Sequence, residues 1–296
     1  MSFTSNTTGA KITVPDIQQR KSQAAGSPTN PKKIACLTAY DYPTARLLDE
    51  AGVDVILVGD SLGMVVLGYD STLPVTVDEM LHHTRAVRRG AHRALVVADM
   101  PYGSYHTDMA EAVRNAMRFI KDAGAEAVKV EGGERRLELI ARFSEAEIPV
   151  MAHVGLTPQS VNALGGYHVQ GKTAVGAEQL LRDARAVEAA GAFAIVLEAI
   201  PRELAAQITK EVRIPTIGIG AGPDCDGQIL VLSDMVGLTF GQTPKFSRQY
   251  ASVGEIISGA VREYCEDVRN ATFPTDAESY HTPQSGKNRK TISITG

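Results

Sequence analysis

Short hydrophobic segments alternate with longer amphipathic segments over most of the chain. Three of the amphipathic segments, residues 77–91, 110–125 and 177–192, repeat their apolar residues with the spacing of a helix. The hydrophobic segments are uniformly apolar, which is typical of parallel strands covered on both faces. The pattern predicts a single (β/α)₈ TIM barrel. Its strands are expected within residues 33–41, 54–60, 94–100, 127–133, 149–155, 193–200, 215–222 and, less clearly, 229–238.

An open, doubly wound sheet is the alternative arrangement for this pattern. Such a sheet usually has a G-x-G-x-x-G turn after its first strand, and the corresponding segment here, AYDYPTA, has no glycine. Ala-Gly pairs that begin at Ala51, Ala123 and Ala190 each precede a predicted strand. Each interval between these pairs is about two βα units, which favours the barrel.

The two ends of the chain lie outside this pattern. Residues 1–32 are polar and rich in Ser, Thr, Asn and Gln, so we expect a disordered N-terminal extension. Residues 275–296 are similarly polar and are expected to form a flexible C-terminal tail. The barrel domain is therefore expected over residues 33–274.

Composition excludes several classes of function. The net charge of −4 argues against a nucleic-acid-binding protein, which needs a basic face. No apolar run approaches the roughly 20 residues of a membrane span. The three cysteines are widely spaced and form no C-x-x-C pair, which indicates reduced thiols in a cytoplasmic protein. We expect small-molecule substrates, and neither nucleic acid nor membrane as a partner.

Residues 166–173, GYHVQGKT, match the phosphate-binding motif G-x-x-x-x-G-K-[ST]. In a working phosphate loop the first glycine directly follows a strand. Here the nearest upstream strand is expected to end near Gly155, and a polar segment with a proline lies between. The match is therefore interpreted as accidental, and no nucleotide is expected.

Carboxylates stand at or just beyond the ends of four predicted strands. Asp60 follows the second, Asp99 and Glu131 follow the third and fourth, and Glu198 follows the sixth. All strands of a barrel point their C-terminal ends to one face, where active sites lie. We therefore expect Asp60, Asp99 and Glu131 to meet at the mouth of the barrel, with Glu198 facing them.

Three carboxylates held together repel one another, and a divalent cation would cancel that repulsion. Oxygen ligands without cysteine favour Mg²⁺, which usually keeps positions for substrate oxygens. A 2-oxo acid could supply two such oxygens. Lys129, two residues before Glu131, points to the same side of its strand and could neutralise a substrate carboxylate. Glu198 would then be free to act as a base.

Structural roles could also explain these residues. Asp41 precedes a predicted helix and is expected to cap it, and Asp60 could be a cap as well. Capping is the weaker account for three acids that share one face. Lys129 and Glu198 could form a buried ion pair. His153 could hydrogen-bond a substrate or could be satisfied within the barrel.

Several motifs then identify a family. They are residues 38–80 around GDSLGM, 99–105 (DMPYGSY), 128–133 (VKVEGG), 153–159 (HVGLTPQ), 170–173 (QGKT), 196–201 (VLEAIP), 214–222 (IPTIGIGAG) and 225–238. In this order they resemble the ketopantoate hydroxymethyltransferase family over roughly residues 33–274. Two departures are minor: Ala152 precedes His153 where the family usually has glycine, and Tyr102 replaces a usual phenylalanine.

The resemblance implies a (β/α)₈ barrel that uses 5,10-methylenetetrahydrofolate to hydroxymethylate 3-methyl-2-oxobutanoate on the way to pantothenate. It further implies a cytoplasmic homo-oligomer, often a decamer, with one Mg²⁺ per subunit. By matching motif, the resemblance implies that the metal is bound by Asp60, Asp99 and Glu131. The residues that contact the oxo acid would be Asp60, Ser61, Asp99 and Lys129. The proton acceptor would be Glu198.

Two other functions remain open at this point. Mg²⁺-dependent mutases and lyases of the phosphoenolpyruvate mutase/isocitrate lyase type use a related barrel, but they typically carry a catalytic cysteine loop. No such cysteine motif occurs here between the fourth and fifth predicted strands. A non-catalytic barrel that binds a metal or a metabolite is the second alternative, and it would have no need of Glu198.

Overall fold

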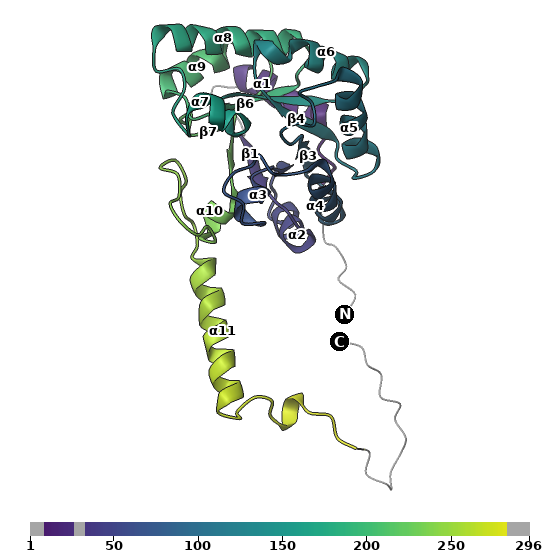
Figure 1. Ribbon diagram of the computed structural model, residues 1–296, viewed down its shortest axis with the longest axis vertical. Coiled ribbons are helices and arrows are strands. Elements are labelled where there is room, and N and C mark those ends of the chain that lie inside the picture. Colours follow the sequence, from purple (N-terminus) through teal and green to yellow (C-terminus); the bar gives the residue numbers. More distant parts are fainter. Residues whose placement is uncertain (1–8, 27–32, 283–296) are drawn as a thin grey trace.

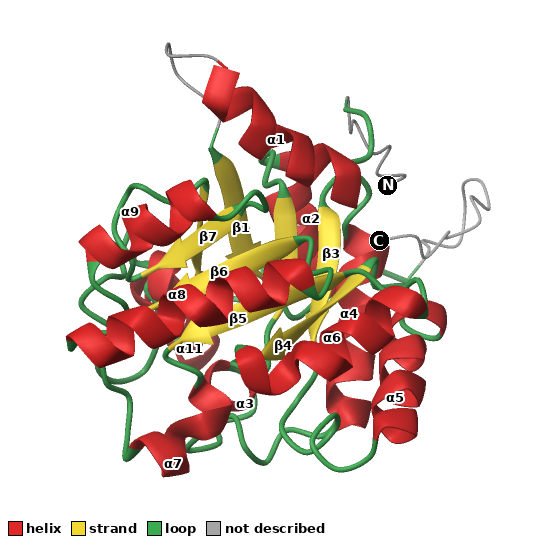
Figure 2. Ribbon diagram, turned by 90° about the horizontal axis from the view of Figure 1, so that it is seen from above, coloured by secondary structure: helices red, strands yellow, loops and turns green. Residues whose placement is uncertain are grey.

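The computed structural model describes residues 9–26 and 33–282. Eight parallel strands pair in chain order and close on themselves, because β8 pairs with β1. The predicted (β/α)₈ barrel is therefore confirmed (Figures 1 and 2). The strands are β1 (Ile34–Thr38), β2 (Val55–Val58), β3 (Leu95–Asp99), β4 (Ala127–Glu131), β5 (Val150–Gly155), β6 (Ala194–Glu198), β7 (Thr216–Ile219) and β8 (Gly227–Leu230).

Six helices cover the outside of the barrel: α2 (Tyr42–Glu50), α4 (Val77–Gly90), α5 (Met109–Lys121), α6 (Leu137–Glu145), α8 (Ala174–Ala189) and α9 (Arg202–Glu211). Local capping fixes where several of them start. The Asp41 carboxylate accepts from the Thr44 N–H at 2.8 Å, so the predicted cap of α2 is confirmed. Thr76 and Glu79 form a capping box at the start of α4.

Side chains along each strand point alternately into the barrel and out to the helices, and this divides the core into two layers. Along β4, Val128 and Val130 face the outer helices, whereas Ala127 belongs to the cluster inside the barrel. Lys129 and Glu131 share the inward side of Ala127, but they lie closer to the strand's C-terminal end and line a cavity there. The inner side of the barrel is thus apolar at the bottom and charged at the mouth.

The expectation of a disordered segment over residues 1–32 is wrong for its described part. Helix α1 (Val14–Gly26) lies at the N-terminal end of the barrel, and Ile12 and Ile17 are buried in the inner core cluster. Arg20 of α1 forms an ion pair with Asp54 at 2.6 Å. The described residues before β1 therefore help to close the barrel bottom; residues 1–8 and 27–32 lie outside the described chain.

The region after β7 departs from the regular βα repeat. A short loop, residues 220–226, joins β7 to β8 without a helix. The predicted last strand, 229–238, is strand only as far as Leu230; α10 (Leu232–Val236) follows it. Helix α11 (Val253–Arg269) then extends away from the barrel (Figure 1), and none of its residues is buried.

The remaining elements are short. α3 (Leu62–Val65), η1 (Glu134–Arg136), η2 (Pro158–Ser160) and α7 (Val161–Leu164) lie in the loops after β2, β4 and β5. Of the expected C-terminal tail, residues 275–282 are described and contain the turn η3 (Asp276–Glu278), and residues 283–296 lie outside the described chain. Within the described ranges, no helix has both the length and the apolarity that crossing a bilayer requires.

Candidate active site

The strand-end acids gather at the mouth of the barrel as predicted. Asp60, Asp99 and Glu131 are 2–4% exposed, and all three line one cavity of about 990 Å³. The Asp99 carboxylate accepts from the backbone N–H of Asp60 at 3.1 Å. Neither Asp60 nor Ser61 caps α3 with its side chain. The capping explanation of Asp60 is therefore wrong.

Gln159 connects two of these acids. Its side-chain amide donates to Asp60 at 2.8 Å and to the Met100 carbonyl at 3.0 Å. Its backbone N–H donates to Glu131 at 3.0 Å. The amide oxygen in turn accepts from the hydroxyl of Tyr105 at 2.6 Å. Gln159 thus fixes the orientation of two carboxylates, one at the end of β4 and one in the loop after β2.

Burial and mutual repulsion make the acid cluster electrostatically unfavourable. Burial, with the charges of Asp99 and Glu131, raises the pKa of Asp60 well above its ordinary value. Burial also raises the pKa of Asp99, against the opposing effect of Lys129. Burial alone would raise the pKa of Glu131, but His153, the charge of Lys129 and the backbone N–H of Gln159 together lower it. The cluster is therefore short of positive charge.

Lys129 is the cation inside the cluster. Its ammonium group is buried and donates to the Asp99 carboxylate. Burial alone would lower the pKa of Lys129, but the charges of Asp99, Glu131 and Asp60 raise it. Among the described residues its ion pair is with Asp99 and not with Glu198. The alternative of a Lys129–Glu198 pair is therefore wrong.

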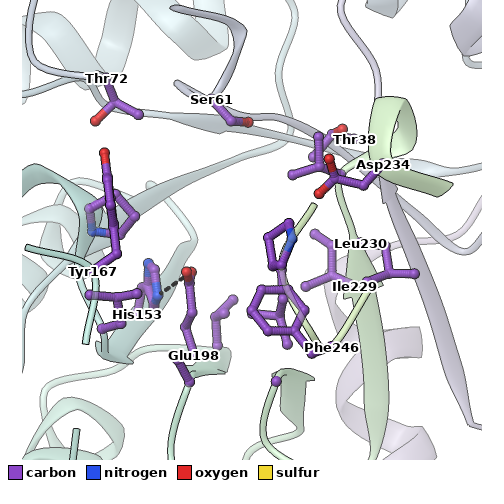
Figure 3. A pocket seen from close by; sticks show the side chains of 18 of the residues that line it. Thr38, Ser61, Thr72, His153, Tyr167, Glu198, Ile229, Leu230, Asp234 and Phe246 are labelled. Atoms are coloured by element: carbon purple, nitrogen blue, oxygen red, sulfur yellow. Dashed lines mark ion pairs between the residues drawn. The ribbon is translucent and has the colours of Figure 1, made fainter. Parts of the chain in front are cut away.

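His153 lies beside Glu198, with which it forms an ion pair (Figure 3). Its Nε2 is 3.2 Å from a Glu198 oxygen, and its Nδ1 is 3.4 Å from a Glu131 oxygen. Burial and Lys129 would lower the pKa of His153, but the two carboxylates raise it to about 9. His153 is thus a cation held inside the barrel, although neither ring nitrogen meets full hydrogen-bond geometry. The side chain of Glu198 is 16% exposed, more open than the other strand-end acids.

The same cavity is lined by loops whose role the sequence did not reveal. Tyr167, His168 and Val169 come from the segment with the phosphate-loop motif. That segment follows α7 and not a strand, as expected, so it lacks the structural context of a phosphate loop. Ser61 also lines the cavity, and its hydroxyl is 2.9 Å from the hydroxyl of Tyr40.

The donor atoms of this cluster suit a divalent cation, but their side chains are not yet arranged around one point. The donors are buried carboxylate oxygens in a region that lacks positive charge, which suits Mg²⁺. However, no three His, Cys, Asp or Glu side chains of the described residues already stand as a ligand set around one point. Asp99 is turned to Lys129, and Asp60 is held by Gln159. Binding would require the Asp99 carboxylate to turn towards the ion, whereas Asp60 can offer its Oδ1 while Gln159 holds its Oδ2.

A family model described as ketopantoate hydroxymethyltransferase matches residues 11–276 of the chain. The chain belongs to this family. A relative from Koribacter versatilis named 3-methyl-2-oxobutanoate hydroxymethyltransferase is 62% identical over 254 residues, which is 86% of each chain. A relative of the same name from Syntrophus aciditrophicus is 54% identical over 272 residues, 92% of this chain and 97% of its own. The protein is therefore a hydroxymethyltransferase.

Solved structures of more distant proteins share the fold of this family member. A phosphonopyruvate hydrolase complex with oxalate and Mg²⁺ superposes with a TM-score of 0.57 at 17% identity and covers 91% of this chain and 92% of its own. A 2,3-dimethylmalate lyase of the PEP mutase/isocitrate lyase superfamily gives a TM-score of 0.57 at 16% identity, with 92% and 90% covered. At this identity the likeness shows the barrel fold alone.

Sequence reasoning missed four residues that complete the hydroxymethyltransferase site: Tyr40, Tyr105, Gln159 and Tyr167. Tyr105 and Gln159 lie inside motifs that carry the family resemblance, and this was the only signal that could have pointed to them. Their hydrogen bonds join residues 54 and 99 positions apart along the chain. No local periodicity reports such contacts.

Proposed function

We propose that this protein transfers a hydroxymethyl group from 5,10-methylenetetrahydrofolate to 3-methyl-2-oxobutanoate and gives 2-dehydropantoate, an early step towards pantothenate. The observation that carries the proposal is the position of Glu198. Its carboxylate opens onto the cavity, is held by His153 at 3.2 Å, and shares that cavity with Asp60, Asp99 and Glu131. A base placed beside a polar, oxygen-rich site suits removal of a proton next to a carbonyl.

In the proposed reaction Glu198 accepts the proton from C3 of the oxo acid, and the C–H electrons form the enolate. The enolate carbon then forms a bond to the methylene carbon of the folate, and the first of the two C–N bonds of that carbon breaks. Water supplies the hydroxyl group as the second C–N bond breaks, and the proton from C3 and one proton from water end on the two nitrogens of the tetrahydrofolate that leaves. His153 keeps Glu198 oriented, which makes it a positioning residue. Contact between His153 and the substrate, the other possibility for this residue, is not needed for that role.

We assign the metal positions to Asp60, Asp99 and Glu131, with one Mg²⁺ per subunit. When bound, the ion supplies Lewis-acid stabilisation of the developing enolate charge. Asp60, Ser61, Asp99 and Lys129 contact the oxo acid. Lys129 is suited to this because its buried ammonium lines the cavity beside Asp99 and could offset the charge of a substrate carboxylate.

A homo-oligomer, a decamer as the family resemblance implies, completes the proposal. The exposed side of α11 carries Ile257, Val261, Tyr264 and Val268, each 47–57% exposed. A second copy of the chain is the partner that we infer for this side. The three free cysteines fit a cytoplasmic location, where thiols stay reduced.

Proton exchange tests the role of Glu198 directly. We expect the wild-type protein with Mg²⁺ to exchange the C3 hydrogen of 3-methyl-2-oxobutanoate in deuterated buffer without folate. Glu198→Gln should bind the oxo acid but lose exchange by about 100-fold or more, since a general base contributes on that scale. Exchange at the wild-type rate in this variant would remove Glu198 from the base role.

The rival functions give different results in a turnover assay. A lyase or mutase of the phosphoenolpyruvate mutase type would not consume methylenetetrahydrofolate, and none of the described cysteines lines the cavity. A non-catalytic binding barrel would bind the oxo acid without exchange. Formation of 2-dehydropantoate that depends on both substrates would exclude both alternatives.

A further inference from the structure

The active-site cavity has a second end that the proposed proton transfer does not use. Figure 3 shows His153, Glu198 and Tyr167 on one side of the cavity, and Asp234, Leu230 and Phe246 on the other. A volume of about 990 Å³ lies at the upper limit of ordinary ligand pockets, roughly 300–1,000 Å³. A small oxo acid fills only part of this space, so a second and larger ligand has room beside it.

Asp234, at the second end, is a buried carboxylate with free acceptor capacity. It is 7% exposed, lies on α10 and lines the cavity. One oxygen accepts from the Thr239 hydroxyl at 2.5 Å, and the other is 3.3 Å from the Ser247 hydroxyl. A carboxylate offers about four acceptor positions, so about two remain for a ligand. A ligand with two parallel N–H donors would match them.

Phe246 and Lys245 extend this end of the cavity towards solvent. The Phe246 ring lines the cavity and is 36% exposed, and Ile229 and Leu230 provide aliphatic surface on the same side. Gly220 leaves room for the ring: a Cβ there would lie 2.6 Å from a Phe246 ring carbon. Lys245, also a lining residue, is exposed. Along this end a carboxylate, an aromatic ring and a cation therefore follow one another.

We infer that this end of the cavity binds the folate co-substrate, and that Asp234 recognises its pterin ring. The 2-amino group and the ring N–H of a pterin are the parallel donors that the free Asp234 positions match. The flat ring packs against Phe246, and Lys245 offsets the carboxylates of the glutamate tail. This orientation keeps the pterin and its one-carbon unit within the cavity that Glu198 shares. The inference rests on the proposed function.

Two ligands of different length distinguish the contact of Asp234 with the pterin from the contact of Lys245 with the glutamate tail. Binding of tetrahydrofolate and of tetrahydropterin, which lacks the benzoylglutamate tail, is measured anaerobically by calorimetry. Asp234→Asn should weaken binding of both ligands by about tenfold or more, because it replaces a charged acceptor. Lys245→Ala should weaken only tetrahydrofolate, by about fivefold, and less at high salt.

Two further variants control for indirect effects. Ser247→Ala removes a hydrogen bond to Asp234, and Ser247 does not line the cavity, so this variant should change both affinities less than about threefold. If it weakens binding as much as Asp234→Asn does, Asp234 only holds the loop and the inference is wrong. Phe246→Ala should weaken both ligands by about fivefold or more, and it tests the site even if Asp234→Asn fails to fold.

The outcome also distinguishes this inference from the proposed function. If the wild-type protein neither binds tetrahydrofolate nor forms 2-dehydropantoate, the proposed function itself fails. If the wild-type protein binds tetrahydrofolate and the Asp234 and Phe246 variants bind it equally well, the function stands and the subsite lies elsewhere. Equal loss of tetrahydropterin binding in Lys245→Ala would overturn the assigned orientation.

Discussion

Gln159 shows how single residues outside the first set of acids control the site. It donates to Asp60 with its side chain and to Glu131 with its backbone, and it is 4% exposed. Without the side-chain amide, the Asp60 carboxylate loses a hydrogen bond that directs one oxygen, and the Tyr105 hydroxyl loses its acceptor. A carboxylate free to rotate pays an ordering cost when it binds a cation.

We therefore predict that Gln159→Leu weakens Mg²⁺ binding by about tenfold and lowers the free energy of unfolding by about 1–3 kcal/mol. Calorimetric Mg²⁺ titration and urea unfolding measure the two effects, with Asp60→Ala as the reference for lost binding. Gln207→Leu removes an exposed hydrogen bond to Glu211 and is the matched control. Mg²⁺ affinity at the wild-type level in Gln159→Leu would show that Gln159 does not position Asp60.

His106 should make the stability of the folded protein depend on pH. Burial, followed by the charge of Arg136, lowers its pKa from 6.5 to about 4. The folded protein therefore resists protonation that the unfolded chain accepts. Stability from this residue is complete above pH 6.5 and is lost as the pH falls towards 4.

The variant His106→Gln cannot titrate, so it should lose less stability than the wild-type protein between pH 7 and pH 5. After allowance for solvent screening of this partly exposed residue, we expect a difference of about 1 kcal/mol. Urea unfolding of both proteins at the two pH values measures it. Parallel losses in the two proteins would mean that the pKa of His106 is not lowered.

The acids that line the cavity could be predicted from the sequence because their positions follow from strand ends. Asp99 and Glu131 each end a hydrophobic segment, and in a barrel all such ends meet. The partners of these acids could not be predicted in the same way. Tyr105 and Gln159 lie in irregular loops after β3 and β5, where only the folded chain brings them together.

At the scale of elements, helix α1 was missed because its own sequence is largely polar. Its stability comes from contacts with distant residues rather than from an apolar stripe. Ile17 is fully buried in the inner core cluster, and Arg20 and Lys21 pair with Asp54 and Asp226, which precede β2 and β8. A segment of this kind reads as disordered until the barrel that it closes is known.

Arg20→Ala should therefore destabilise the barrel as a whole. It leaves the buried carboxylate of Asp54 without its main partner, and breaking a buried pair costs about 3–5 kcal/mol. Because Arg20 is partly exposed, we expect about 2–3 kcal/mol in urea unfolding. Arg182→Ala breaks an exposed pair with Glu178 and should cost less than about 0.5 kcal/mol. Equal effects would mean that α1 does not stabilise the barrel.

At the scale of the whole molecule, the outer face of the barrel is left uncovered by the described residues at β1 and β8. Ala35 of β1 and Gln228 of β8 are exposed on the outside, whereas β2 to β5 are almost entirely buried. Helix α11, which follows β8, points away from this part of the wall (Figure 1). Helix α11 of one copy can therefore pack against the exposed barrel wall of another copy.

We predict that the double variant Ile257→Glu and Val261→Glu separates the oligomer into smaller species. Each glutamate would place a charge in the inferred apolar interface, at a cost of several kcal/mol unless it is paired. Sedimentation velocity at micromolar concentration measures the change in size. Ser258→Glu with Gly259→Glu adds the same two charges outside this apolar stripe of α11 and should leave the assembly intact. A wild-type protein that sediments as a monomer would exclude the homo-oligomer. An unchanged oligomer in the first variant would exclude this side of α11 as the interface.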